Sequence, residues 1–383
     1  MSMTLKQMRP VYVIGVGLDR YQRASERPYV EMGLTAIRAA LADGNIEWQD
    51  VESFYLGTLA LGMAPARTMI RHLGTTGVAI AQVENASASG STSFRQACLD
   101  VASGITDVSM ATGIDKLGPI NSAAAQLGFD SLVRKPMAPV AQFALLANRY
   151  MSEYGTSLEQ LASVAVKNHR NGAMNPYAQR QKVRTLEEVL APPYISGPLS
   201  RLQCCPFGEG AAAVLVASEQ AVSALPIDET RLVRVIASVS RSEQLYSAGE
   251  NSDSELTGSS IKMAFEQAEI SADQLDVVEL HDAFSIEEIL YAEAMGLCEE
   301  GQAAPLIAAG EFDIGGRCAL SPSGGLLSMG HPMGPTGTGQ IAEITRQLRG
   351  EAGTRQQPNA KIGLAHMVGV GAVCLVHVLQ KVW

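Results

Sequence analysis

The chain has 383 residues, of which 46% are hydrophobic and 18% are charged, and its formal net charge is −10. This length suits two packed units, and the composition is that of a well-buried α/β enzyme, which excludes a disordered or fibrous chain. The excess of acidic residues also argues against a nucleic-acid partner, because a surface that binds nucleic acid must neutralise phosphates.

The cysteines and the chain ends indicate the compartment. Six cysteines, at positions 98, 204, 205, 298, 318 and 374, show no spacing typical of a zinc site, which favours a reduced protein without a bound metal. The N-terminus lacks the apolar core of a signal peptide, the C-terminus lacks a peroxisomal tripeptide, and no apolar run reaches membrane-spanning length. We therefore expect a cytoplasmic protein without a membrane partner.

Strand-like apolar runs recur along the chain with helical patterns between most of them. This alternation predicts an α/β fold with a largely parallel sheet and crossover helices. In the first part of the chain the runs cover residues 11–17, 51–59, 78–83, 108–112 and 211–217, and in the second part they cover residues 232–239, 277–281, 361–366 and 372–379.

The order of these runs predicts an internal duplication. Residues 107–113 followed by 210–217 correspond to residues 360–369 followed by 371–379. We expect one half at residues 1–230 and a second at 231–383. Residues 114–203 interrupt the first half, and we expect this insertion to form a cap over the site, because long insertions in compact domains are usually functional.

Ser87 lies at a predicted strand-to-helix turn. The strand is the run 78–83, and an amphipathic helix follows. Unpaired N–H groups gather at such a turn, and they can hold a nucleophile or a developing oxyanion. A serine before a helix is more often a simple N-cap, so Ser87 alone is a weak signal. The helix stripe consists of Phe94, Ala97, Cys98, Val101, Ala102 and Ile105.

The second half of the chain carries three histidine motifs. They are His281-Asp-Ala-Phe284, Gly330-His331-Pro332 and His366-Met-Val-Gly-Val-Gly-Ala372. His281 and His331 follow a strand or a glycine turn, where sites form in α/β proteins. Together with the Ser87 turn, and in this order, they resemble the motifs of thiolases, most closely the sterol-carrier-protein-2 type. Supporting matches lie at residues 167–171, 175–179 and 205–213.

The resemblance spans nearly the whole chain and implies a fold. That fold is a five-layer α/β/α/β/α arrangement of two duplicated halves of the βαβαβαββ type. It also implies a homodimer or a dimer of dimers, with the edge strands near residues 78–83 paired. No permanently bound cofactor is expected, because coenzyme A and acyl-CoA thioesters are substrates of this family.

The resemblance also implies catalytic roles. Ser87 stands at the place of the cysteine nucleophile, and its own N–H belongs to one oxyanion hole. His331 and His281 match the residues that polarise a thioester oxygen. His366 stands at the place of the second reactive cysteine. We expect the Ser87 Oγ to lie within roughly 2.6–3.2 Å, or one water, of a nitrogen of His331 or His366.

Further residues are implied to bind substrate. The N–H groups around Val368 and Gly369 match the other oxyanion donors. Phe284 and Gly330 belong to the blocks that carry His281 and His331, and we include them among the substrate-binding residues. The full set of expected site residues therefore has eight members: Ser87, His281, His331, His366, Val368, Gly369, Phe284 and Gly330.

Two sulfur atoms expected from the resemblance are missing. Residue 87 is serine, either native or introduced in place of cysteine, and Ala283 stands where the sterol-carrier type often has a second cysteine. A serine hydroxyl needs a positioned general base, whereas a cysteine can act as a thiolate. An acyl-serine is also more stable than a thioester, so onward transfer of the acyl group is harder.

Three functions stay open at this point. The first is an acyl-CoA C-acyltransferase that cleaves or forms a β-ketoacyl-CoA. The second is a thiolase-like retro-aldolase that splits a β-hydroxyacyl-CoA with a small accessory acyl-CoA-binding protein, since acid–base residues and oxyanion holes suffice for that reaction. The third is a non-catalytic subunit that binds acyl-CoA.

Overall fold

The computed structural model describes residues 4–118, 139–246, 252–369 and 373–382. Ten strands form one sheet in the order β10-β9-β11-β12-β8-β1-β7-β4-β2-β3. The first five in the chain are β1 (Val11–Leu18), β2 (Ser53–Gly57), β3 (Ala79–Val83), β4 (Val108–Asp115) and β7 (Gly210–Ser218). The others are β8 (Val233–Ser242), β9 (Val277–Glu279), β10 (Ala319–Leu320), β11 (Ile362–Gly369) and β12 (Val373–Lys381).

The strand order reveals two equivalent halves. From the centre outward, one half reads β1-β7-β4-β2-β3 and the other reads β8-β12-β11-β9-β10. Strand β1 of the first half thus corresponds to β8 of the second, and each strand farther from the centre has a counterpart at the same position in the other half. The two halves join through a short antiparallel pairing, in which Tyr12 faces Arg234 and Val13 faces Val233. The division of the chain after residue 230 remains our proposal for the domain boundary.

The prediction of a largely parallel sheet is wrong. Strand β2 is parallel to β3 and β4, and β9 is parallel to β10 and β11, but all the other neighbouring pairs are antiparallel. Only three residues separate β11 from β12, too few for the crossover that a parallel pair requires, so this pair runs in opposite directions. A run of apolar residues reveals burial but carries no information about strand direction.

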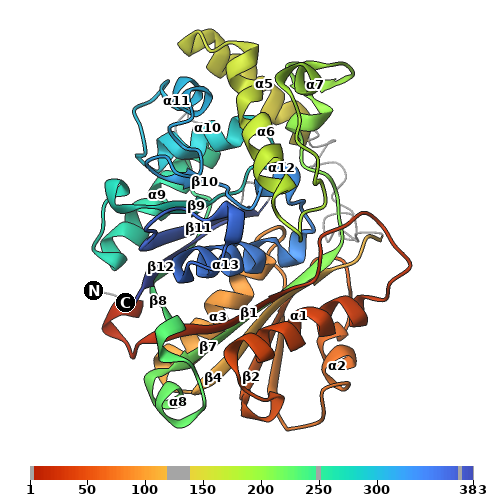
Figure 1. The fold of residues 1–383 in the computed structure, drawn as a ribbon, viewed down its shortest axis with the longest axis vertical. Coiled ribbons are helices and arrows are strands. Elements are labelled where there is room, and N and C mark those ends of the chain that lie inside the picture. Colours follow the sequence, from red (N-terminus) through yellow and green to blue (C-terminus); the bar gives the residue numbers. More distant parts are fainter. Residues whose placement is uncertain (1–3, 119–138, 247–251, 370–372, 383) are drawn as a thin grey trace.

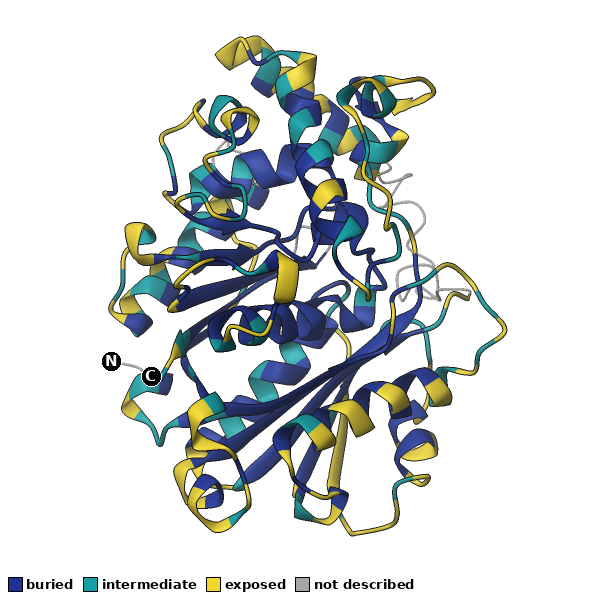
Figure 2. Cartoon of the chain, in the orientation of Figure 1, coloured by how far each residue is buried: buried dark blue, intermediate teal, exposed yellow. Residues whose placement is uncertain are grey.

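The helices complete a five-layer arrangement, as predicted (Figure 1). Helices α1 (Tyr29–Gly44) and α2 (Pro65–Ile70) cover the outer face of the first half. Helices α3 (Ser89–Ser103) and α13 (Met333–Arg349) lie between the halves, and α9 (Ser252–Ala268) and α10 (Ser285–Ala294) cover the outer face of the second. Helix α13 and the strands of the sheet other than β3 are the most deeply buried elements (Figure 2).

The interrupting residues between β4 and β7 form structure of their own. Their described part includes α5 (Pro139–Tyr154), α6 (Leu158–Ala173), α7 (Leu186–Leu190), β5 (Tyr194–Ser196) and β6 (Leu199–Ser200). They pack on the second half beside α10, α11 (Ala303–Ala309) and α12 (Gly325–Ser328). Helix α8 (Glu219–Ala224) follows β7, and short 3-10 turns cover residues 5–7, 48–50, 201–203, 229–231, 272–274 and 353–355.

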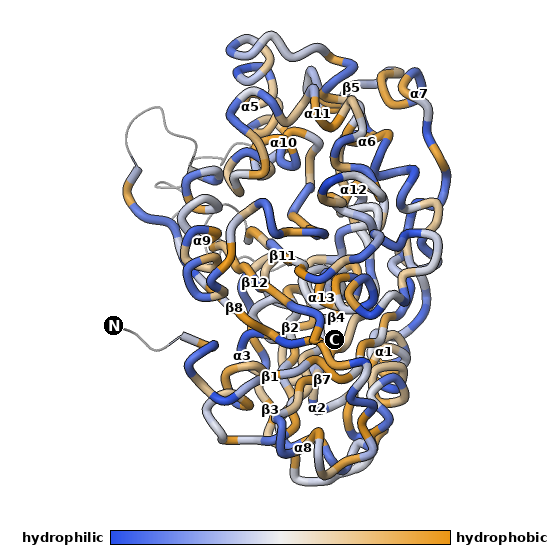
Figure 3. The backbone as a smooth tube through the Cα atoms, turned by 60° about the vertical axis from the view of Figure 1, so that its left-hand side comes forward, coloured by the Kyte–Doolittle hydropathy of each residue, from blue (hydrophilic) through white to orange (hydrophobic). Residues whose placement is uncertain are grey.

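Hydrophobic residues run along the central strands, and hydrophilic residues gather on the outer loops (Figure 3). In the described part of the chain, no helix is long and apolar enough to cross a bilayer.

Helix α3 confirms most of the predicted stripe. Phe94, Ala97, Cys98 and Val101 are buried. The helix ends at Ser103, however, because Gly104 adopts a left-handed conformation with φ of 82°, which terminates helices readily. Ile105 therefore lies beyond the helix and is 73% exposed, so its assignment to the apolar face was wrong.

Candidate functional site

The Ser87 turn connects β3 to α3 through a strained residue. Ala86 has φ of 49°, a left-handed conformation that costs a residue with a side chain about 1 kcal/mol or more. Neighbouring hydrogen bonds hold this turn: the Ser89 hydroxyl donates to Ala86 O at 2.7 Å and accepts from Asn85 N at 2.9 Å. The N-cap of α3 is Ala88, so Ser87 is not a capping serine. Its side chain is free to serve another partner.

That partner is His331. The Oγ of Ser87 lies 3.1 Å from Nε2 of His331, which is the contact expected from the sequence. His331 precedes α13 directly after Gly330, whose φ of 107° favours glycine. Its own N–H donates to Pro206 O at 3.3 Å. Residues that are 244 positions apart in the chain thus meet at the junction of the two halves.

Thr336 fixes the tautomer of His331. The Thr336 hydroxyl donates its single proton to Pro332 O at 2.6 Å, and its oxygen lies 3.0 Å from Nδ1 of His331. The oxygen must therefore accept a hydrogen bond from Nδ1–H. In the neutral ring this leaves Nε2 with a lone pair that faces the hydroxyl of Ser87. The arrangement is that of a general base beside a nucleophile.

Glycines allow the two helix N-termini to approach so closely. A Cβ on Gly90 of α3 would lie 2.4 Å from Gly334 O of α13, and a Cβ on Gly337 would lie 2.6 Å from Ser91 N. Contacts this short are not tolerated, so both positions require glycine at this crossing. The crossing brings Ser87 and His331, each located two residues before its helix, into hydrogen-bond contact.

Burial sets the protonation of this pair. Ser87 and His331 are each 6% exposed. Burial, with a smaller contribution from the nearby His281, holds the pKa of His331 well below its usual value. The imidazole is therefore neutral near pH 7 and can accept a proton from Ser87.

His281 adds a second imidazole to the site. Its ring meets that of His331 edge-on, with 5.3 Å between the ring centroids. Its Nδ1 lies 3.1 Å from Oε1 of Glu287, while its buried Nε2 has no hydrogen-bond partner among the described residues. Glu287 is held in turn by the N–H of Phe284 at 2.8 Å and the hydroxyl of Tyr291 at 3.1 Å. Of the two ring nitrogens, Nε2 is thus the one that can form a further hydrogen bond.

A buried polar network anchors the loop that carries His281. The carboxylate of Asp282 accepts hydrogen bonds from Leu326 N and from the side chain of Asn168. Asn168 also donates to Glu288, which forms a buried ion pair with Lys167 at 2.9 Å. Burial and the charge of Glu288 raise the pKa of Asp282 well above its usual value. The network fixes the loop rather than facing Ser87.

His366 lies on the other side of its strand from the Ser87 turn. Its Nε2 is 3.0 Å from the Thr257 hydroxyl of α9, and its ring packs against Tyr291 of α10 with 4.9 Å between centroids. Burial lowers the pKa of His366 to about 3. In the described part of the structure it makes no hydrogen bond to Ser87 or His331, so its expected role stays a prediction.

The other expected binding residues lie around this centre. Gly369, at the end of β11, packs on the Ser87 turn, since a Cβ there would lie 2.7 Å from Asn85 O. The side chain of Val368 is part of the hydrophobic core. Phe284 stacks on Phe143 with 4.9 Å between the ring centroids, so its side chain is structural while its N–H holds Glu287. Residues 370–372 of the glycine-rich motif lie outside the described residues.

The segment 204–207 links the two histidine blocks and was not singled out from the sequence as a site. Cys205 N donates to Ala283 O at 2.8 Å, and the next residue, Pro206, accepts the N–H of His331. Thr336 and Glu287 were missed as well. Glu287 lies three residues after the N-cap Phe284 and accepts its N–H, but a phenylalanine cannot complete a capping box, so the sequence offers no signal for this glutamate.

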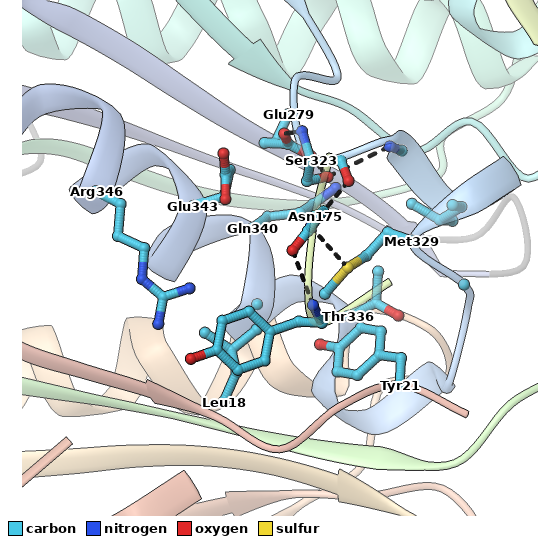
Figure 4. A pocket seen from close by; sticks show the side chains of 15 residues that line it. Leu18, Tyr21, Asn175, Glu279, Ser323, Met329, Thr336, Gln340, Glu343 and Arg346 are labelled. Carbon is cyan, nitrogen blue, oxygen red and sulfur yellow. Dashed lines mark hydrogen bonds between the residues drawn. The ribbon is translucent and has the colours of Figure 1, made fainter. Parts of the chain in front are cut away.

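A small cavity of about 20 Å³ lies between the halves, and Thr336 is one of the residues that line it (Figure 4). This volume holds about one water molecule. Glu279 lines it and accepts two hydrogen bonds from Ser323, at 2.7 and 2.8 Å. Burial and the charge of Glu343 raise the pKa of Glu279 to about 8. Elsewhere too, the described residues form no group of three or more His, Cys, Asp or Glu that could hold a metal ion.

Comparisons with known proteins agree with this architecture. Residues 20–220 match the family model "Thiolase, N-terminal domain", and residues 238–381 match "Thiolase C-terminal domain-like". Human sterol carrier protein 2 is 35% identical over 96% of this chain and 71% of its own length. An acetyl-CoA acetyltransferase from Methanothermobacter thermautotrophicus is 33% identical over 98% of this chain and all of its own.

A solved structure named Ltp2-ChsH2(DUF35) aldolase superposes with a TM-score of 0.85 and 25% identity, covering 98% of each chain. The matched models cover both halves, and the relatives cover nearly the whole chain. The protein belongs to the thiolase family.

Proposed function

We propose that this protein is an acyl-CoA C-acyltransferase that uses Ser87 as its nucleophile. The observation that carries the proposal is the 3.1 Å contact between Ser87 Oγ and the unprotonated Nε2 of His331. A serine needs such a base, and the tautomer set by Thr336 supplies it. The acetyl-CoA acetyltransferase among the relatives supports coenzyme A thioesters as the substrate class.

In thiolysis, Ser87 attacks the β-keto carbon while His331 takes the hydroxyl proton. The bond between the α- and β-carbons then breaks, which leaves an acyl-serine and an α-carbanion that must gain a proton. Coenzyme A next attacks the acyl-serine through its sulfur, and protonated His331 returns the proton to the departing Ser87 oxygen. Because burial keeps the pKa of His331 low, its protonated form is a strong acid that gives the proton back readily.

Oxyanion stabilisation is assigned to donors around Ser87. We place the Ser87 N–H and the N–H groups near Val368 and Gly369 at one carbonyl oxygen, and His281 at the thioester oxygen. The carboxylate of Glu287 stabilises positive charge on the His281 ring when Nε2 carries a proton as well. A preorganised donor of this kind typically contributes about 10²–10³ in rate.

The decisive test compares the chain with Ser87→Cys on acetoacetyl-CoA and longer β-ketoacyl-CoAs. Both proteins should gain the mass of one acyl group, and the cysteine form should turn over faster because its thioester is more reactive. Ser87→Ala and His331→Ala should abolish acylation. If the cysteine form neither becomes acylated nor releases acyl-CoA on any substrate, the proposal fails. If both alanine variants leave every measured reaction unchanged while acyl-CoA still binds, the protein is a binding subunit.

A retro-aldolase is the second candidate, favoured by the superposition on a thiolase-like aldolase. It needs no acyl-enzyme, so the absence of sulfur at positions 87 and 283 is no obstacle. The name of that structure also includes a DUF35 partner, which suggests an accessory subunit. Release of an aldehyde or ketone from a β-hydroxyacyl-CoA, without mass gain on Ser87, would select this function.

We also propose that two copies pair through β3. This strand lies at the end of the sheet, and four of its five residues are exposed. An uncovered strand edge presents unpaired backbone groups that a second copy can satisfy. Light scattering at micromolar concentration should give at least a dimer, and replacement of Ala81 by proline should shift it to monomer. A uniform monomer without the substitution would refute the pairing.

A further inference from the structure

We propose that Cys205 is the group that protonates the α-carbon of the substrate when the carbon–carbon bond breaks. The inference rests on the proposed function and deepens it, because both retro-Claisen and retro-aldol cleavage leave an α-carbanion. Neither reaction can finish until that carbon gains a proton. Ser87 and His331 are engaged with the other carbon, so a separate donor is required.

The backbone places Cys205 between the two histidine blocks. On one side, Cys205 N donates to Ala283 O at 2.8 Å, and Cys204 pairs with Phe284 in an antiparallel bridge. On the other side, the next carbonyl, that of Pro206, accepts from His331 N at 3.3 Å. The segment is therefore held between the loop that carries His281 and the backbone of His331.

The cross-strand register gives the thiol its position. In an antiparallel bridge the neighbouring pair also lies face to face, so Cys205 stands opposite Ala283. Successive side chains of an extended segment point to opposite sides, so Cys204 points away. This is consistent with the Cys204 thiol, which donates to Ser200 O at 3.4 Å. No described residue forms a hydrogen bond with the Cys205 thiol, and Cys205 is only partly buried.

An independent observation indicates that the loop paired with Cys205 faces a ligand. His281 is 7% exposed, and its Nε2 has no hydrogen-bond partner among the described residues although the atom is buried. Such an orphaned polar atom costs free energy unless a ligand or water satisfies it. The Nδ1 side of the ring is occupied by Glu287, so the free nitrogen is the one available to a substrate.

The electrostatics suit an acid. Burial, together with the charges of Glu287 and Asp282, raises the pKa of the Cys205 thiol above its usual value, so it carries a proton at neutral pH. The proton moves from sulfur to the α-carbon, and the electron pair of the S–H bond stays on sulfur as a thiolate. In thiolysis the thiolate recovers a proton from the incoming coenzyme A thiol, and in the aldol reaction from water. The balance closes without a further reagent.

The test is exchange of α-hydrogens for deuterium in acetyl-CoA and propionyl-CoA dissolved in D2O, followed by mass spectrometry. Exchange is the reverse and forward step in succession: the thiolate form of Cys205 removes an α-proton, the thiol exchanges with D2O, and S–D returns a deuteron to the carbon. The unsubstituted protein should catalyse exchange, and Cys205→Ala should lower its rate at least a hundredfold. Cys205→Ser should lower it at least tenfold, which covers the case in which the alanine form fails to fold. Cys204→Ala is the matched control and should stay within threefold.

A rescue variant tests the register itself. Ala283→Cys, added to Cys205→Ala, returns a thiol to the facing residue and should restore at least a tenth of the exchange. Exchange that survives in Cys205→Ala, or no exchange in the unsubstituted protein, would overturn the assignment. Acylation of Ser87 is followed separately by intact mass. If no acyl-serine forms but exchange depends on Cys205, the acyltransferase proposal fails and this one stands.

Discussion

The Oε1 atom of Glu287 lies 3.1 Å from Nδ1 of His281 and accepts a hydrogen bond from the Tyr291 hydroxyl at the same distance. Glu287 belongs to the first turn of α10, so the helix that follows the histidine block also orients the histidine. The residue that orients His281 therefore lies only six positions after it in the chain. Two imidazoles meet in this site, and each is held through Nδ1 by a side chain from the helix directly after it.

Removal of the charge on Glu287 should weaken catalysis. In Glu287→Gln the carboxylate beside His281 Nδ1 is lost, so a positive charge on the ring is no longer stabilised. We expect the cleavage rate on acetoacetyl-CoA to fall roughly tenfold to a hundredfold, the usual range for a residue that orients a functional ligand. Tyr291→Phe retains the carboxylate and should lose less than half as much on a logarithmic scale. Equal rates for Glu287→Gln and the unsubstituted protein would remove His281 from the mechanism.

Thr336 should control the base rather than substrate binding. Thr336→Val removes the acceptor of His331 Nδ1–H, so the ring can adopt the tautomer whose Nε2 carries a proton and cannot accept one from Ser87. The rate of Ser87 acylation should drop roughly tenfold to a hundredfold while KM changes little. Thr336→Ser keeps the oxygen and should restore most of the rate. A change confined to KM would show that Thr336 acts on binding instead.

The helix crossing should not tolerate a methyl group. In Gly90→Ala the new Cβ would lie 2.4 Å from Gly334 O, so the helices must separate. We expect a loss of roughly 1–3 kcal/mol in the free energy of unfolding. Gly258→Ala is a matched control in α9, where the nearest atom would be 3.6 Å away, and it should be neutral or slightly stabilising. Chemical denaturation measures both, and equal stabilities would contradict the close packing.

Glu279 should make stability depend on pH. Its pKa is about 8 in the folded protein because of burial and the charge of Glu343, whereas an unfolded glutamate titrates near 4.5. For a group whose pKa is raised on folding, its contribution to the free energy of unfolding is fully present below the unfolded pKa and is lost as the pH rises to the folded pKa. As the pH rises from 5 to 8, the free energy of unfolding of Glu279→Gln should therefore increase relative to that of the unsubstituted protein, by on the order of 3 kcal/mol.

The exposed Glu266 supplies the control for this titration. Glu266→Gln changes the same functional group on the surface and should leave the pH profile of unfolding unchanged. A difference between Glu279→Gln and the unsubstituted protein that stays constant from pH 5 to pH 8 would show that Glu279 is already charged at pH 5.

Sequence patterns were sufficient for the strands and for the central contact. Apolar runs located nine of the strands, and the Ser87 turn and the Gly330-His331 block correctly predicted a meeting of residues 244 positions apart. The short strand β10 has two residues and offers no periodicity to detect. Strand direction was misjudged because burial alone does not encode it.

The supporting residues could not be found in this way. Thr336 acts through its hydroxyl, yet it lies inside an amphipathic helix where a threonine has no special signal. Cys205 becomes notable only because the chain pairs its backbone with Ala283, a contact between residues 78 positions apart whose register no local pattern contains. His366 shows the converse: a motif histidine whose contacts are with Thr257 and Tyr291.

The equal placement of Ser87 and His331 has a consequence for the origin of the site. Both stand two residues before the start of an interior helix, and α3 and α13 occupy equivalent places in the two halves. An ancestral pair of identical halves would have presented the same side chain from both sides, either two hydroxyls or two imidazoles. In the proposed reaction, Ser87 and His331 could take different roles only after the copies had diverged at this one position, so asymmetry between the repeats is a precondition of the proposed chemistry.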